Sequence, residues 1–463
     1  MSMEQERTFA ESLSETPSVL RYSDILKVGT PIADMNYHTL IPSNGGSFSQ
    51  NQMIRIPFNI PTDSFANLKG AYLKFTINNA DGTNIVSLDP VIGGGAFIDT
   101  LRIVSGTGGN LEEIIHYNAI LSLMNDMVSV GHRQSTGNMT DGSSETPLDD
   151  LALGATGATT LVSGGVRTNI AASGSLTVTH VPMSGFFQCD RLAPLGFSTG
   201  TCYMEIVLPT GNYPLTFLSN ASSENNAWTL SNVELHVPVL RMGSEFNASF
   251  RQLLSSGIPI NWHSTSYHNV QTNVASGTTG ATTLTVSTRK RSVKSIFTIF
   301  RRTEDLTSHH ADCSSCRRSL GIEKYRYTIG GVQMPNSDIA ISSTDFGQNY
   351  ACLLQCLANL GNVYSATCID RDNYRQAIDQ DGSSSQAKAS KIAYGIDLEA
   401  YGHSDVQSGK NLSNQGLPIV MNAQLGTGTA NQASSKDCLC DMFLLYDVVY
   451  SLDGVSGTIT ANS

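Results

Sequence analysis

Charged side chains are scarce in this sequence. Asp, Glu, Lys and Arg make up 14% of the 463 residues, against roughly a quarter in an ordinary soluble domain. The polar surface must come instead from Ser, Thr, Asn, Gln and the 41 glycines. Such a surface is weakly hydrated and packs readily against neighbours, which favours a chain that works in a multi-subunit assembly. Extracellular β-proteins have a similar composition.

Membrane and secretion signals are also missing. No run approaches the ~18 apolar residues that a membrane span needs. The polar start, Met-Ser-Met-Glu-Gln-Glu-Arg, lacks the basic and apolar regions of a signal peptide. We therefore expect a chain made in the cytoplasm or nucleus. Its nine cysteines, an odd number, then fit free thiols better than disulfides.

A basic arm for nucleic acid is absent from residues 1–30, and the net charge of −11 repels phosphate. Local positive charge occurs in three short runs: Arg289-Lys290-Arg291, Arg301-Arg302 and Arg317-Arg318. These runs either form one patch that makes a weak contact with a genome or are simply solvated faces.

One motif resembles the nucleophile elbow of serine hydrolases, with Ser198 at its centre in Gly-Phe-Ser-Thr-Gly. That motif needs a strand before the serine and a helix after it. Here Pro194 precedes it and a strand is predicted at 203–208, so we expect no catalytic serine. No phosphate-binding glycine loop and no acid–base pair is found in the sequence.

A second motif contains possible zinc ligands. Residues 309–316 place His309 and His310 before Cys313 and Cys316 in a Cys-x-x-Cys spacing. Adjacent histidines rarely both reach one metal, the surrounding residues are polar, and the Cys438-x-Cys440 pair has the wrong spacing. We interpret 309–318 as an exposed loop with reduced thiols. We thus expect no catalytic, cofactor-binding or metal-binding residues, no cofactor and no small-molecule substrate.

Alternating apolar and polar residues predict β-strands through most of the chain. The pattern is clearest where Leu73, Phe75 and Ile77 alternate with polar residues. Strands are predicted in the first half at 53–60, 68–77, 96–104, 176–182, 203–208 and 228–240. In the second half they are predicted at 258–268, 282–287, 293–301, 323–329, 392–400, 417–423 and 442–452.

Two helices are predicted from capping boxes. In the first, Asn110 and Glu113 begin a helix over 111–130 that closes at Gly131. The second starts near Asp345, with Gln348 in the capping-box position, and stops at 361. The polar stretch 131–175 is interpreted as an outward protrusion that is dispensable for folding.

The two halves end alike, which indicates a duplicated β-domain. Residues 202–240 and 417–450 each contain a strand, a polar loop and a strongly β-prone closing strand. We predict an N-terminal arm at 1–45 and two domains at 46–250 and 251–463.

This order of elements resembles the double jelly-roll major capsid proteins of the adenovirus, virophage and Polinton-like virus lineage. The likeness covers about 45–460. The likeness is carried by the order of the predicted strands and helices. The elements that contribute to it include the alternating strand 53–60, the strand 97–105 that leads into 111–130, and the closing strand 442–452. It implies an all-β fold of two consecutive eight-stranded jelly rolls, each with an inserted helix and long loops.

The resemblance also implies a function. Three chains of that family form a homotrimeric pseudo-hexagonal capsomer, and capsomers form an icosahedral shell around DNA in the virion. The partners would be other copies, neighbouring capsomers, and penton and minor capsid proteins, with assembly in the host cytoplasm or nucleus. The family has no catalytic residues to transfer. The alternative is a β-sandwich binding module or hydrolase, such as a phage adhesin or carbohydrate-binding protein, which the two Trp and 7% aromatic residues disfavour.

Overall fold

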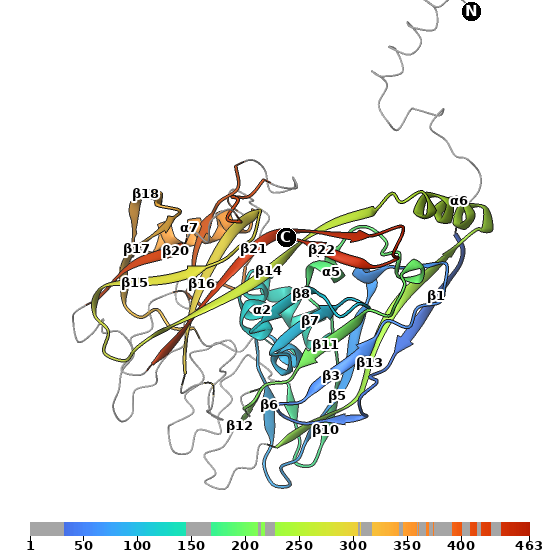
Figure 1. The fold of residues 1–463 in the computed structure, drawn as a ribbon. Helices are drawn as coiled ribbons and strands as arrows, with labels where there is room; N and C mark the ends of the chain where they lie inside the picture. Colours follow the sequence, from blue (N-terminus) through green and yellow to red (C-terminus); the bar gives the residue numbers. More distant parts are fainter. Residues whose placement is uncertain are drawn as a thin grey trace, which may run out of the picture.

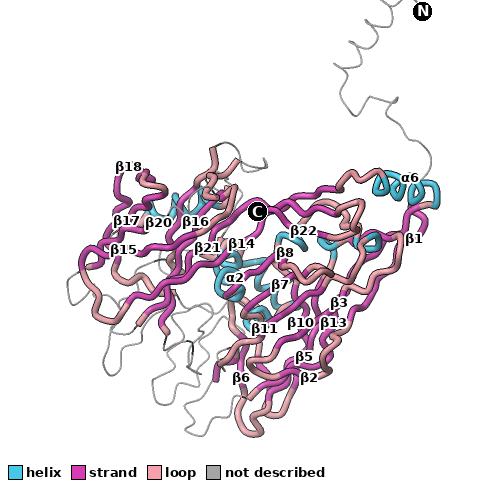
Figure 2. The backbone as a smooth tube through the Cα atoms, in the orientation of Figure 1, coloured by secondary structure: helices cyan, strands magenta, loops and turns pink. Residues whose placement is uncertain are grey.

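The computed structural model describes residues 32–144, 168–211, 214–217, 227–303, 306, 317–341, 346–358, 360, 367–369, 374, 391–400, 408–413, 418–426 and 437–463. Within these ranges the chain is mostly β-sheet, and its helices are short (Figure 2). None of these helices is long and apolar enough to cross a bilayer.

The first half contains two principal sheets. One has the strand order β1-β13-β5-β10 and the other β3-β11-β7-β8 (Figure 1). These strands are β1 (Ile32–Leu40), β3 (Met53–Pro57), β5 (Tyr72–Asn79), β7 (Thr100–Val104), β8 (Asn110–Ile115), β10 (Ser175–His180), β11 (Tyr203–Val207) and β13 (Trp228–Met242). Shorter strands add to these sheets or form a small third one: β2 (Ser47–Phe48), β4 (Ser64–Ala66), β6 (Val86–Leu88), β9 (Asn169–Ile170) and β12 (Leu215–Phe217).

The second half repeats the arrangement. Its sheets have the orders β14-β21-β16-β19 and β15-β20-β17-β18. The strands are β14 (Ile260–Val274), β15 (Gly280–Ser287), β16 (Val293–Arg302), β17 (Ile322–Ile329), β18 (Val332–Ala340), β19 (Tyr394–Asp397), β20 (Pro418–Leu425) and β21 (Cys438–Leu452), and β22 (Ile459–Asn462) pairs with β21.

Both halves follow one topology. With the eight main strands of each half numbered in chain order, one sheet holds the first, eighth, third and sixth strands. The other sheet holds the second, seventh, fourth and fifth. This is the strand order of a jelly roll. A helix follows the fifth strand in each roll: α2 (Tyr117–Asp126) in the first and α7 (Gly347–Cys356) in the second.

The strand patterns explain the sheets. In β5 the side chains of Leu73, Phe75 and Ile77 are buried, and in β17 Tyr325, Tyr327 and Ile329 are buried. Most predicted strands are confirmed with shifts of a few residues at their ends. The closing strands β13 and β21 each have 15 residues and each pair on both sides. Because they are central in their sheets, both edges of each strand are hydrogen-bonded, and the side chains that face the core are apolar, such as Leu235 and Val237 in β13.

The predicted start of the first helix is wrong. Asn110 and Glu113 lie in β8, which pairs with β7 so that Leu101 is opposite Ile114. Glu113 forms an ion pair of 2.5 Å with Arg102 on the neighbouring strand. The helix begins only at residue 117, after the backbone turns at His116 with φ +51°. Cross-strand pairing and burial here override the local capping pattern.

The stretch 131–175 is not a simple protrusion. Residues 130–140 form a continuous helical segment of α3 (Val130–His132), a π-helical turn (Arg133–Gly137) and α4 (Asn138–Thr140). Arg133, Ser143 and Ser144 are buried, so this part belongs to the packed structure. Residues 145–167 lie outside the described residues, and their protruding position stays a prediction.

The domain limits can be compared with the strands. Residues 32–40 of the expected arm are a strand that pairs with β13 from Ile32↔Met242 to Leu40↔Leu235. Residues 1–31 are outside the described ranges. The expected boundary at 250/251 lies within α6 (Ser244–Ser255), which connects the last strand of the first roll to the first strand of the second. The strands β1 and β18 and helix α6 were not predicted from the sequence.

Candidate functional site at the junction of the two rolls

Three carboxylates are buried where the two rolls meet: Glu112, Asp126 and Asp441. Glu112 lies on β8 and Asp126 at the end of α2, both in the first roll, and Asp441 lies on β21 in the second. Buried apolar residues from both rolls form one contiguous core around them. A buried charge is costly unless it is paired or hydrogen-bonded, so the partners of each carboxylate define how the rolls fit together.

Glu112 is held by four neutral donors. The backbone N–H groups of Gly185 and Phe186 donate to its two oxygens at 2.7 and 3.0 Å. The hydroxyl of Ser266 donates to Oε1, and that of Tyr450 donates to Oε2 at 3.1 Å. Ser266 is on β14 and Tyr450 on β21, so one carboxylate of the first roll is shared with two strands of the second.

The two rolls approach closely beside this carboxylate. Gly185 begins α5 (Gly185–Gln188), and a Cβ atom at this position would lie 2.7 Å from the backbone oxygen of Thr265 on β14. That distance is shorter than a normal van der Waals contact. A side chain at 185 would therefore separate α5 from β14 and break the hydrogen bonds to Glu112.

Asp126 is surrounded by three cations. Arg133 of the first roll donates to Oδ1 at 2.6 Å, Arg317 donates to Oδ2, and the ammonium of Lys391 lies 3.3 Å from Oδ1. Arg317 and Lys391 belong to the second roll. Two hydrogen bonds to the backbone complete the contact. The N–H of Cys368 donates to the backbone oxygen of Asp126 at 3.0 Å, and the ammonium of Lys391 donates to the backbone oxygen of Cys368 at 3.0 Å.

These charges keep Asp126 ionised. Burial by itself raises the pKa of Asp126, but the charges of Lys391, Arg317 and Arg133 outweigh burial and hold the pKa well below its ordinary value of 3.8. The side chains of Asp126 and Arg317 are at most 1% exposed. Removing the carboxylate would leave buried cations without a counter-charge, which is among the most destabilising changes in a protein.

Asp441 makes the reciprocal contact from the second roll. Arg301 donates to its Oδ2 through Nε at 3.0 Å and through Nη2 at 2.7 Å, and Asn269 donates to Oδ1 at 3.1 Å. The Nδ1 atom of His116, at the start of α2, lies 2.8 Å from Oδ1. Burial raises the pKa of Asp441, but Arg301 and then His116 outweigh it and hold the pKa well below the ordinary value.

The C-terminal hairpin adds two hydrogen bonds between the rolls. The hydroxyl of Ser105 donates to the backbone oxygen of Ile459 at 2.8 Å. The N–H of Thr199 donates to the oxygen of Gly457 at 2.7 Å. The junction is thus a set of mostly buried polar contacts between the rolls. These contacts fix the orientation of the rolls, since Asp126 and Asp441 are paired with buried cations and Glu112 is held by neutral donors.

The predicted basic patch is largely wrong. Arg301 and Arg317 are each 2% exposed or less and are paired with Asp441 and Asp126. Arg318 is also buried, at 7% exposed. They cannot form a surface for nucleic acid, because burial with a carboxylate removes both their charge and their donors from solvent. Arg289 and Arg291 remain exposed.

The other motifs from the sequence lie apart from the junction. Ser198 follows a short 3-10 helix, and its hydroxyl donates to the backbone oxygens of Leu195 and Gly200. No strand–serine–helix elbow is present in this described stretch. Residues 307–316, with both histidines and both cysteines of the suspected zinc motif, lie outside the described residues. Cys438 and Cys440 are buried on β21.

Sequence reasoning missed the junction carboxylates. Glu112 fell inside a predicted helix, and neither Asp126 nor Asp441 belongs to a motif. Their partners come from strands and loops up to 338 residues away along the chain. The one local signal was that Arg301 and Arg317 each belong to a pair of arginines, and these pairs were interpreted as surface charge.

Comparisons with known proteins agree with the fold. No family model and no curated protein sequence matches the chain. Among solved structures, the chain is similar to VP54 of PBCV-1, fitted into a reconstruction of the virophage Sputnik, with a TM-score of 0.60 at 9% identity. The match covers 95% of this chain and 99% of that one.

Two further structures show the same likeness. The Faustovirus major capsid protein matches with a TM-score of 0.57 at 12% identity over 92% of both chains. A chain of the Sputnik virophage matches with a TM-score of 0.55 at 12% identity, over 96% of this chain and 92% of that one. The double jelly-roll fold implied by the resemblance is confirmed, and it spans nearly the whole length of each protein compared.

Proposed function

We propose that this chain is a viral major capsid protein, a structural subunit without a catalytic step. The observation that carries the proposal is the repeated jelly-roll order in both halves, held in one orientation by the buried junction. Solved structures with the same fold along their whole length include a major capsid protein and chains from virus particles.

The doubled roll suits a threefold capsomer. Three copies place six similar rolls around one axis, which approximates a hexagon and can tile a closed icosahedral shell around a DNA genome. A head-to-tail contact repeated by threefold rotation closes into a ring and does not propagate into fibres. A ring of this kind needs a fixed angle between the rolls of each chain, and the Glu112, Asp126 and Asp441 contacts supply it.

The proposed partners follow from this role. They are other copies in the trimer, neighbouring capsomers, and penton and minor capsid proteins, all within the virion. Contact with the genome would be weak, because the net charge is −11 and Arg301 and Arg317 are buried. Among the described members of the basic runs, Arg289 and Arg291 are exposed, and Lys290 and Arg302 are partly exposed.

We also propose the two rolls as the two domains: the expected boundary between 46–250 and 251–463 lies inside α6, and the first domain extends back to include β1. The polypeptide arm would then be limited to residues before β1, since β1 is part of the first sheet.

Light scattering of the purified full-length protein tests the trimer. We expect a particle of about 150 kDa, three times the chain mass of 49.6 kDa, or larger shells. Electron microscopy of the same sample should show threefold particles with a hexagonal outline. A stable monomer at micromolar concentration, with cooperative unfolding that proves it is folded, would contradict the proposal.

A further inference from the structure

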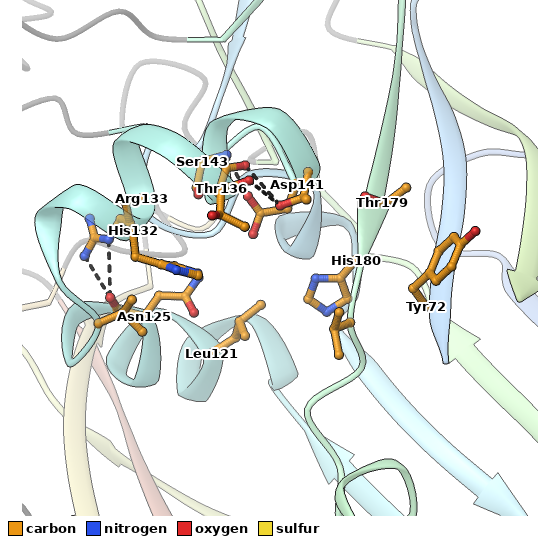
Figure 3. Close-up of a pocket in the computed structure, with 14 residues that line it drawn as sticks. Tyr72, Leu121, Asn125, His132, Arg133, Thr136, Asp141, Ser143, Thr179 and His180 are labelled. Atoms are coloured by element: carbon orange, nitrogen blue, oxygen red, sulfur yellow. Dashed lines mark hydrogen bonds between the residues drawn. The ribbon is translucent and has the colours of Figure 1, made fainter. Parts of the chain in front are cut away.

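A cavity of about 560 Å³ lies against α2 in the first roll (Figure 3). This volume is within the range of roughly 300–1,000 Å³ that is usual for small-molecule sites. Leu121 and Asn125 of α2 line it. Ser122 and Asp126, one position further along the helix, instead contact Arg317 of the second roll. The helix therefore separates the cavity from the junction.

The walls combine aliphatic surface with polar side chains, among them Asn125, His132 and Arg133. Leu121, Val128 and Val181 supply aliphatic surface. The opposite wall is the helical segment 130–140, and β10 closes the remaining side, as Figure 3 shows.

His180 supplies a hydrogen-bond donor to the cavity. Its side chain is 4% exposed and projects into the cavity in Figure 3. The hydroxyl of Tyr117 accepts the N–H of Met183 at 2.7 Å, so its own proton is directed to His180 Nε2, 2.8 Å away. Burial lowers the pKa of His180 to about 4, so the ring is neutral at pH 7 and its proton is on Nδ1. In the described part of the chain, Nδ1 has no acceptor.

Asp141 supplies an acceptor on the same cavity. Its Oδ1 accepts the N–H of Ser143 at 2.8 Å. No ion pair joins Asp141 to a cation within the described ranges, and burial raises the pKa of its carboxyl. A carboxyl group in this setting can accept a hydrogen bond from a donor on a ligand and disfavours an anion.

We propose that this cavity binds a small neutral molecule with an apolar body and a hydroxyl head group. The hydroxyl oxygen accepts the proton of His180 Nδ1, and the hydroxyl proton is donated to Asp141. The apolar body covers Leu121, Val128 and Val181. A carboxylate head group would face the Asp141 carboxyl, and an ammonium, which has no lone pair, could not accept the proton of His180 Nδ1.

An occupant would act on the junction through α2. The ligand would fill space on one side of the helix while Asp126 and His116 hold the other side to the second roll. Occupancy should therefore stabilise the folded chain by mass action. This inference concerns the single chain and does not depend on the proposed capsid role.

Three probes with one chain length test the head group: octan-1-ol, octanoate and octylamine. Titration calorimetry and the melting temperature of the full-length protein at pH 7 are the measurements. We expect saturable binding of one octan-1-ol per chain with a raised melting temperature, and at least tenfold weaker binding of the other two. Equal binding of all three, or no binding of octan-1-ol, would overturn the proposal.

Two matched variants locate the binding. Val181→Trp places a large ring at the mouth of the cavity from a position that is 62% exposed, so the fold should persist. It should reduce octan-1-ol binding at least tenfold. Val332→Trp, at a 56% exposed position in the second roll, should leave binding unchanged. His180→Phe should reduce the preference for octan-1-ol over octylamine. Identical binding by both Trp variants would place the probe elsewhere and reject the site.

Discussion

Helices α2 and α7 occupy the same place in the two rolls, after the fifth strand, but their buried polar groups point to different partners. Asp126 of α2 reaches Arg317 and Lys391 of the other roll. Asn349 of α7 stays within its own roll, where it accepts from Tyr325 at 2.7 Å and donates to Tyr374 at 2.9 Å. Equivalent elements of one fold can thus either join two rolls or close one core.

The difference shows what topology leaves undecided. Both helices are ten residues long and both pack on a sheet of their own roll. Strand order places the helix, whereas one or two polar side chains decide whether its outer side becomes an interface. The rolls are therefore alike in fold and unequal in role.

The largest effect is expected when the charge of α2 is removed. Asp126→Ala leaves Arg133, Arg317 and Lys391 without their carboxylate, which should cost about 3–5 kcal/mol in the free energy of unfolding. Urea unfolding at pH 7 measures this. Asp190→Ala is the control, because Asp190 is 83% exposed and its described ion pair is with the exposed Lys69. Equal stability of the two variants would show that the junction charge is not needed.

A smaller and more local effect is expected from α7. Asn349→Ala removes the bonds to Tyr325 and Tyr374 and should cost about 1–3 kcal/mol. Hydrogen exchange should rise in β17 and β19 and stay unchanged in α2. Gln355→Ala, at an exposed position of the same helix, should change neither the free energy of unfolding nor the hydrogen exchange. If hydrogen exchange in α2 rises as much as in β17, the effect of α7 is not confined to the second roll, which would contradict the comparison.

Acid should distinguish the helices further. The folded pKa of Asp126 is below its unfolded value of 3.8, so its stabilisation is complete above that value and is lost as the pH falls toward the folded pKa. Between pH 7 and pH 3 the cost of Asp126→Asn should shrink by about 1 kcal/mol. The cost of Asn349→Ala should stay constant, because Asn does not titrate and burial raises the pKa of Tyr325. Urea titrations at pH 7 and pH 3 measure the loss of stability in both variants. A loss for Asn349→Ala that shrinks with falling pH would contradict the prediction.

The smallest effect is expected at Ser122. Its hydroxyl accepts from Arg317 at 3.4 Å and donates to the backbone oxygen of Ala119 at 2.8 Å. Ser122→Ala should cost about 0.5–1.5 kcal/mol, well below Asp126→Ala, since it removes a neutral partner only. A cost as large as that of Asp126→Ala would mean that the hydroxyl, and not the charge, positions Arg317. Thermal unfolding of the unchanged protein, Ser122→Ala and Asp126→Ala under the same conditions measures the two costs.

The parts of the fold that follow local patterns could be predicted from the sequence. The alternation of Leu73, Phe75 and Ile77 gave the correct strand, and Gly330 and Gly331, with φ of +61° and +79°, form a two-residue turn between β17 and β18. The likeness of the closing strands correctly indicated two similar β-units, and the resemblance supplied the jelly-roll order.

The junction could not be predicted, because its determinants are distant in sequence. Asn110 and Glu113 matched a capping box, yet pairing with β7 made this segment a strand. Glu112 then points to donors on α5, β14 and β21. Arg301 and Arg317 look like surface charge until the fold places a buried carboxylate beside each one.

The closing strands also set the order in which the molecule can form. In each roll the last of the eight main strands to be synthesised is central in its sheet, so β1 must wait for β13, and β14 must wait for β21, about 200 residues later in each case. Such long-range pairing folds slowly. The first roll can close once residue 242 has been made, but Ser266, Arg317 and Tyr450 are still to come. During that interval Glu112 and Asp126 face solvent, together with the apolar surface around them. The growing chain therefore passes through an intermediate in which the first roll is folded and its apolar junction surface is exposed. Misassembly between nascent chains is expected to begin at this surface.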